Sequence, residues 1–221
     1  MVPVHLGVSS VPRYVTSVSR QPAACQSRAS ALRESVATVA GLLGIRGTTK
    51  RHDRAGHALY SAAVAAARDP WFYQALGVPD TLDGRFDLVA LHAFLLVHRL
   101  QDASDPGPAL AQALFDAMFR DMDNNLREIG VSDLSVAKRM RAMWEAFHGR
   151  AKVYSSAIQA ADRAALEAAL ARNVWRGAAP QGAVASLATI VLAQTAHLAD
   201  QPIAAFASGA AHFLSAAEAS R

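Results

Sequence analysis

The residues that most restrict the fold of this chain are 85–101, RFDLVALHAFLLVHRLQ. On a helix this stretch is apolar on nearly every side, whereas a helix at a protein surface has one apolar and one polar side. A helix of this kind needs other elements around it. The sequence therefore predicts a central, buried helix that is covered by the rest of the chain.

The composition indicates that the covering elements are helices too. Hydrophobic residues make up 52% of the 221 residues, which is enough for a sizeable core. Alanine is abundant, β-branched residues are comparatively few, and there is no internal repeat and no alternation of strands with helices. We predict an all-α fold: a single, bundle-like helical domain over residues 55–221, behind a basic, flexible N-terminal segment at 1–54. The expected helices are 55–68, 70–76, one that begins between Thr81 and Arg85 and ends near Gln101, 107–129, 134–158, one from Asp162 to about Asn173, 183–200 and 203–218.

Short polar side chains mark several of the expected helix starts, because they accept hydrogen bonds from the free N–H groups of a first turn. These residues are Asp69, Asp80, Thr81, Ser132 or Asp133, and Asp162. Asp83–Gly84 is expected to reverse the chain before the central helix. Asp116–Arg120 and Asp123–Arg127 have the four-residue spacing that favours ion pairs on a helix.

The basic character of the chain comes from its first quarter. Residues 1–56 contain eight Lys or Arg and two Asp or Glu, a net charge of +6, while residues 57–221 have a net charge of −2. The early part is compatible with a transit peptide, a disordered tail, or a start codon assigned too far upstream. Residues 30–44 have the spacing of a short amphipathic helix, which would either touch an anionic membrane or pack on the body. The single cysteine, Cys25, excludes an internal disulfide and indicates a reducing compartment.

Motifs of catalysis and of metal binding are missing. HExxH, the repeated Glu-x-x-His motif of di-iron bundles, nucleotide-binding glycine loops and GxSxG are all absent. His92 lies within the apolar stretch and is expected to be a hydrogen-bonded core residue. We therefore predict no catalytic residues, no metal and no cofactor. The most apolar other stretch, 183–199, is interrupted by polar residues and is too short to span a bilayer.

A cluster of basic residues lies on the expected helix 134–158. It comprises Lys138, Arg139, Arg141, Arg150 and Lys152. The cluster forms either a solvated face or a contact with an acidic partner or with lipid headgroups. Direct binding of nucleic acid is not expected, because the body is net acidic and lacks aromatic residues interleaved with the basic ones.

Three strings between residues 55 and 155 are long and unusual: FYQALGVPDTLDGRFD, LFDAMFRDMDNNLREIGVSDLSV and FHGR. In this order they resemble the ubiquinol–cytochrome c chaperone family. The resemblance implies an all-helical chaperone that binds newly made cytochrome b during assembly of respiratory complex III. It also implies a small partner subunit. Residues 1–54 match nothing in this pattern, and residues 160–221 match it only loosely.

Candidate client-binding residues come from these strings alone. The polar candidates are Asp80, Thr81, Asp83, Arg85, Asp121, Asp123, Arg127 and Glu128. The apolar candidates are Phe115, Met118, Phe119 and Met122, since Met and Phe adapt to varied partners. Helix caps and internal salt bridges are the alternative for the polar group, and core packing is the alternative for the apolar group.

Two other functions compete with that of a chaperone. One is a helical, membrane-peripheral enzyme or binding protein that acts on quinone or haem, which would need a pocket around His92. The other is a membrane- or ribosome-surface module that uses the basic N-terminal segment. We expect a bacterial cytoplasmic protein that is peripheral to the inner membrane, with the matrix side of the mitochondrial inner membrane as the alternative.

Overall fold

The computed structural model describes residues 45–221, with side chains from Lys50 onward. Over these residues the fold is all-α, as predicted, and no strand occurs. The helices are α2 (Ile45–Ala67), α3 (Pro70–Gln74), α4 (Leu82–Gln101), α5 (Gly107–Glu128), α6 (Asp133–Gln159), α7 (Arg163–Trp175), α8 (Ala183–Ala199), α9 (Ile203–Ala207) and α10 (Ala216–Ala219). The expected amphipathic helix at 30–44, the flexible N-terminal segment and Cys25 lie outside the described residues. No helix in the described part is both long enough and apolar enough to cross a membrane.

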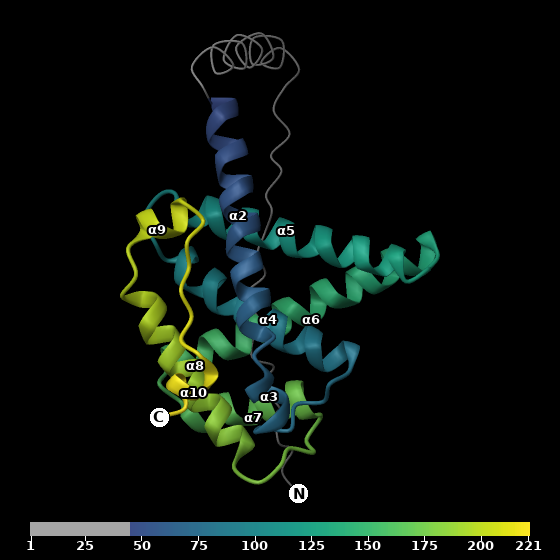
Figure 1. The fold of residues 1–221 in the computed structure, drawn as a ribbon, viewed down its shortest axis with the longest axis vertical. Coiled ribbons are helices and arrows are strands. Elements are labelled where there is room, and N and C mark those ends of the chain that lie inside the picture. The colour runs from purple at the N-terminus through teal and green to yellow at the C-terminus, as the bar shows by residue number, and fades with distance from the viewer. Residues whose placement is uncertain (1–44) are drawn as a thin grey trace, which may run out of the picture. The chain divides into compact units, whose positions relative to one another are not determined.

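The apolar helix α4 lies at the centre, as its sequence predicted. It contacts α5, α6, α7 and α8 (Figure 1). Its residues from Ala90 to Val97 are buried without interruption, which agrees with a helix that is apolar on every side. The need to cover all sides of α4 therefore explains why these four helices pack around it.

Local capping sets several of the helix starts. The side chain of Asp69 accepts from Trp71 N at 2.9 Å, and that of Thr81 accepts from Gly84 N at 3.2 Å. Asp162 likewise caps α7 through Ala165 N. Ser132 is the residue before α6, but its side chain makes no capping bond. The expected chain reversal at Asp83–Gly84 is wrong, because both residues lie in the first turn of α4.

Helix α2 begins at Ile45, earlier than the expected start at residue 55, and crosses α5 closely. Gly56 allows this approach: a Cβ atom at this position would lie 2.5 Å from the carbonyl carbon of Ala113. Near the same crossing, the Tyr60 hydroxyl donates to Asp121 Oδ2 at 2.7 Å. The glycine and the hydrogen bond together fix α2 against α5.

The C-terminal part differs most from the expectation. A single helix was predicted over 203–218, but α9 ends at Ala207 and α10 covers only Ala216–Ala219. The residues between them form an extended segment that runs beside α8 (Figure 1). The residues are alanine-rich, so local propensity favoured a helix, and contacts with distant side chains have overridden that propensity.

Candidate interaction surface

Helices α5 and α6 form a hairpin whose outer end extends away from the other helices (Figure 1). Leu126 and Val136 are 8% and 2% exposed, yet neither belongs to the central core cluster. The outer half of the hairpin therefore has a small apolar packing of its own. We call residues 119–146 the outer hairpin.

Large exposed apolar side chains gather on this hairpin and at the start of α4. Ile129 is 62% exposed, Leu134 is 89% exposed and Trp144 is 48% exposed. Leu82, the first residue of α4, is 69% exposed, and Val153 further along α6 is 38% exposed. Isolated exposed apolar residues are common, but a group on one projecting element is typical of a contact surface.

Sequence reasoning missed these residues, although one signal was present. Leu134 and Val136 are two residues apart, so a helix places them on nearly opposite sides. Val136 is buried against the hairpin, and Leu134 must therefore face outward. The spacing alone does not say which of the two is buried, because this depends on where α5 lies.

The candidates at the start of α4 interact with one another locally. Arg85 Nε donates to Asp80 Oδ1 at 2.6 Å, and this guanidinium lowers the pKa of the Asp80 carboxyl below its usual value. Thr81 caps the helix, and Asp83 is an acid in its first turn. All four polar side chains are at the surface, with Leu82 among them.

The polar candidates on α5 also have partners within the chain. Asp121 accepts from Tyr60 and from Asn125 Nδ2, the latter at 3.1 Å. Arg127 donates to Asp123 at 2.7 Å and to Asp133 at 2.5 Å, so this arginine ties the end of α5 to the start of α6. Glu128 is exposed next to Ile129.

The ion pair expected between Asp116 and Arg120 on α5 is absent. Asp116 accepts instead from Gln112 Nε2 at 2.7 Å, and no ion pair of Arg120 occurs within residues 50–221. A four-residue spacing permits such a pair but does not require it, because an exposed pair is worth little against side-chain entropy.

The apolar candidates divide by burial. Met118 is fully buried in the central core. Phe115, Phe119 and Met122 are partly buried and pack against that core, and the rings of Phe115 and Phe119 lie 4.5 Å apart. Phe115, Phe119 and Met122 are therefore partly accessible to solvent at the base of the outer hairpin, whereas Met118 is not.

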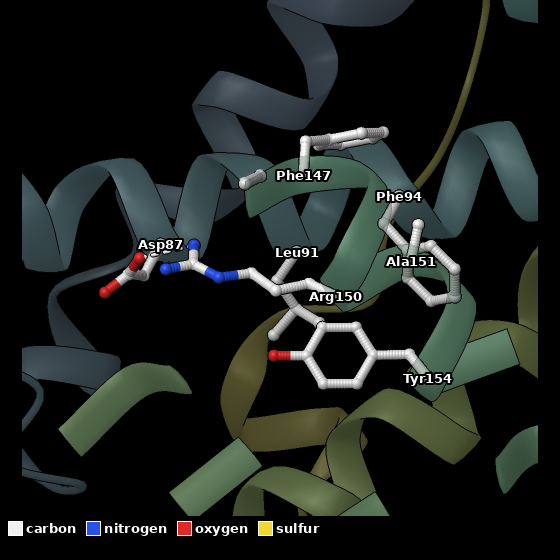
Figure 2. A pocket seen from close by; sticks show the side chains of 8 residues that line it. Asp87, Leu91, Phe94, Phe147, Arg150, Ala151 and Tyr154 are labelled. Atoms are coloured by element: carbon white, nitrogen blue, oxygen red, sulfur yellow. Dashed lines mark hydrogen bonds and ion pairs between the residues drawn. The ribbon is translucent and has the colours of Figure 1, made fainter. Parts of the chain in front are cut away.

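The base of the outer hairpin is held in place by a buried carboxylate, Asp87, which sequence reasoning missed. Asp87 on α4 is 3% exposed and accepts from Arg150 of α6 at 2.6 Å and from Arg176, which follows α7. Burial raises the pKa of Asp87, and both guanidinium groups oppose that rise. Figure 2 shows Arg150 reaching past Leu91 and Tyr154 toward Asp87. The cavity beside it is small, about 10 Å³, and is lined by residues of α4 and α6.

A wider hollow of about 310 Å³ lies between the end of α4 and α8. It is lined by His98, Arg99, Asp102 and Thr195, together with the apolar Leu95 and Ala199. Burial lowers the pKa of His98, and Arg99 is engaged by the carbonyl groups of Leu198 and Gln201 at 3.0 and 3.1 Å. The polar groups of this hollow are therefore largely occupied by the protein itself.

His92 lines neither of these hollows. It is 2% exposed, and its Nδ1–H donates to the carbonyl of Leu88 at 2.8 Å, as expected of a core histidine. Burial lowers its pKa to about 4, so the ring is neutral at physiological pH. Among residues 50–221 no three His, Cys, Asp or Glu side chains gather in a way that would hold a metal ion.

Comparison with known proteins places the chain in a family. A model of the ubiquinol-cytochrome C chaperone family matches residues 74–213. Ubiquinol-cytochrome-c reductase complex assembly factor 1 of Xenopus laevis is 26% identical over 116 residues, which are 52% of this chain and 58% of that protein. The crystal structure of the Cbp3 homolog from Brucella abortus is 35% identical with a TM-score of 0.71, over 80% of this chain and 98% of that one. The matched region includes α4 and the whole α5–α6 hairpin, and the chain therefore belongs to the ubiquinol-cytochrome C chaperone family.

Proposed function

We propose that this protein is a non-catalytic chaperone for the assembly of the ubiquinol–cytochrome c oxidoreductase complex, and that its client is newly made cytochrome b. The observation that carries this proposal is the family match over residues 74–213, more than half of the chain. The similarity to an assembly factor of the same complex supports it, although the chain spans only 58% of that relative's length. The solved relative, which is covered almost completely, supports the fold on which the role depends.

The client surface in this proposal combines the start of α4 with the outer hairpin. A chaperone for an apolar membrane protein needs accessible apolar side chains, and the rim of charges keeps the same surface soluble. Leu82, Ile129, Leu134 and Trp144 would supply the apolar contacts. The polar rim is formed by Asp80, Thr81, Asp83, Arg85, Asp121, Asp123, Arg127 and Glu128, and Phe115, Phe119 and Met122 would contribute at its base, whereas Met118 serves the core.

The test is affinity capture of the tagged chain from its own membranes, followed by mass spectrometry and a haem spectrum. We expect enrichment of cytochrome b without the other subunits of the mature complex. Absence of cytochrome b from the eluate of a well-expressed, folded chain would rule out the client assignment. The haem spectrum tells whether the captured client has already received its cofactor.

Variants locate the surface within the same experiment. Ile129→Asp and Leu134→Asp should each lower the yield of cytochrome b at least tenfold, because a charge would be placed in an apolar contact. Val153→Asp is the matched control, since Val153 is also an exposed apolar residue of α6 but lies outside the proposed surface. Equal losses for all three variants would remove the outer hairpin from the client surface.

We also propose that the protein works at the inner membrane as a peripheral protein, on its cytoplasmic face, with a small partner subunit during client capture. The basic side chains Lys138, Arg139, Arg141 and Lys152 on α6 support contact with anionic lipid, since all four are exposed and lack ion-pair partners among residues 50–221. Sedimentation with vesicles of anionic and of neutral lipid tests this proposal. Binding that is equal for both vesicle types would contradict it.

A further inference from the structure

The extended segment at residues 210–215, which we call the strap, is bound by the protein in the way a sheet edge binds a peptide. The side chain of Gln194 on α8 donates to the carbonyl of Leu214 at 2.7 Å and accepts from its N–H at 3.0 Å. The side chain of Gln201 does the same for His212, at 2.7 and 3.0 Å. Two side-chain amides thus take the place of a neighbouring strand.

The spacing of the two residues fits this description. In an extended chain, residues i and i+2 present their N–H and C=O groups on the same side, and residue i+1 presents them on the other. Leu214 therefore turns its backbone toward Gln194 of α8, and His212 turns its backbone toward Gln201, which follows α8. Backbone pairing of this type gives affinity without reading side chains, as in peptides that add a strand to a sheet.

One side chain of the strap anchors it over a buried floor. The ring of Phe213 lies 5.4 Å from the ring of His92, and Phe72 lies 5.4 Å from the same imidazole. His92 and Gln194 are 2% and 1% exposed beneath the strap. The strap itself is only partly covered, since His212 and Ser215 are exposed and Phe213 is partly buried.

The two ends of the strap are held differently. After the strap, Ala216 N donates to Asp69 Oδ2 at 3.1 Å. Before it, Gly209 has a φ of +86°, and a Cβ atom there would lie 2.9 Å from the Cβ of Ala58. The strap therefore leaves α9 through a glycine. It is secured by two glutamines, by the partly buried side chains of Ala211, Phe213 and Leu214, and by one distal hydrogen bond. Residues 210–215 are partly buried or exposed and none is fully buried, and such a segment opens at lower free energy than the core.

We propose that the groove beneath the strap is a binding site for an extended apolar peptide segment, and that the strap is its resident, exchangeable occupant. The ligand class follows from what the groove already holds: an extended backbone whose two N–H and C=O pairs face Gln194 and Gln201, with an aromatic residue between them. The inference rests on the proposed function in one respect, because the physiological competitor would be an unfolded segment of the client. The groove and the outer hairpin would then bind different parts of that client.

The test measures binding of a fluorescent peptide to the full chain by anisotropy. The peptide has the sequence of residues 208–218, SGAAHFLSAAE, which contains the strap. A tethered strap competes at an effective concentration in the millimolar range, so the wild-type chain should bind the peptide weakly. Phe213→Ala weakens only the resident strap, and we expect it to bind the labelled peptide at least tenfold more tightly than wild type. Adding Gln194→Leu to Phe213→Ala should abolish that gain, because the pairing amide is lost.

The controls separate exchange from general loosening. His212→Ala keeps every backbone bond of the strap and should behave as wild type, and a peptide with alanine in place of the phenylalanine should not bind. A folded Phe213→Ala chain that binds no more peptide than wild type overturns the proposal. Hydrogen exchange on wild type gives an independent answer: the amides of His212 and Leu214 should exchange by local opening, and exchange only through global unfolding would also overturn it.

These outcomes are independent of cytochrome b capture. Loss of the client assignment would leave the peptide result intact, since the peptide is the chain's own sequence. A chain that captures cytochrome b but shows no exchange of the strap would retain the proposed function without this groove.

Discussion

Three polar residues are buried in the described part of the chain, and each has a hydrogen-bonding partner that offsets the cost of burying it. Asp87 is bound by two arginines, His92 donates to the carbonyl of Leu88, and Gln194 pairs with the backbone of Leu214. A buried polar group without a partner would cost several kcal/mol. Asp87 joins α4 to α6 and to the end of α7, whereas His92 and Gln194 both lie beneath the strap.

His92 predicts a pH dependence of stability. Its pKa is about 4 in the folded chain against 6.5 in the unfolded one, so between these values the unfolded chain binds more protons. The free energy of unfolding should therefore fall as the pH drops from 6.5 toward 4, by up to roughly 3 kcal/mol from this residue. Urea unfolding of wild type and of His92→Phe across this window measures the difference. His92→Phe should lose this fall in stability, and an unaltered profile in His92→Phe would contradict the assignment.

The ion pairs of Asp87 predict that loss of an arginine destabilises the chain more than loss of the buried acid. Arg150→Met leaves the buried carboxylate with Arg176 alone, and we expect a loss of roughly 2 kcal/mol in the free energy of unfolding. Asp87→Leu should cost less, because the side chain of Arg176 is 52% exposed and that of Arg150 is 19% exposed, so both have a route to water. Denaturant unfolding of the two variants decides this. A larger loss for Asp87→Leu would show that the arginines have no such route.

At the scale of the elements, helices were predictable where the signal is local. The apolar surface of α4 and the capping residues Asp69, Thr81 and Asp162 place helix starts within a residue or two of those observed. The strap was not predictable, because its extended conformation depends on Gln194 and Gln201, which precede the residues they bind, Leu214 and His212, by 20 and 11 residues. The start of α2 was missed for a different reason: its first turns are polar and show no apolar spacing.

The candidate surface was predictable only in part. The polar candidates were taken from the strings that carry the resemblance, but their local bonds emerge only in three dimensions. Tyr60, for example, reaches Asp121 from a helix 61 residues earlier in the chain. The exposed side chains Leu82, Ile129 and Leu134 were missed because exposure depends on which elements lie nearby. Apolar residues are expected in the core unless a structure shows that nothing covers them.

Two helical glycines predict opposite effects of the same substitution. Gly56→Ala should destabilise the chain, because a Cβ atom at 2.5 Å from the Ala113 carbonyl carbon forces α2 away from α5. Gly149→Ala, in α6, has nothing within 4 Å of the added atom and should stabilise the chain by about 0.5–1 kcal/mol through helix propensity. Thermal unfolding of both variants tests this pair. Equal shifts of Tm would contradict the close crossing of α2 and α5.

At the scale of the molecule, a central apolar helix supports a projecting hairpin, and the ion pairs of Asp87 join α4 to α6 and to the end of α7 at its base. This arrangement suits a protein that presents a rigid surface to a client, because the contact residues stand on packed helices. The family match covers the central helix and the hairpin together. The proposed client surface therefore lies within the region that the family model matches.

The most direct test of the assembly role is the level of ubiquinol–cytochrome c oxidoreductase activity in membranes of a strain that lacks this protein, measured together with the cytochrome b transcript. The account predicts that activity and the assembled complex fall while the transcript persists. Wild-type protein should restore both, and Leu134→Asp should fail where Val153→Asp succeeds. Normal activity and a normal amount of the complex in the deletion strain would contradict the assembly role.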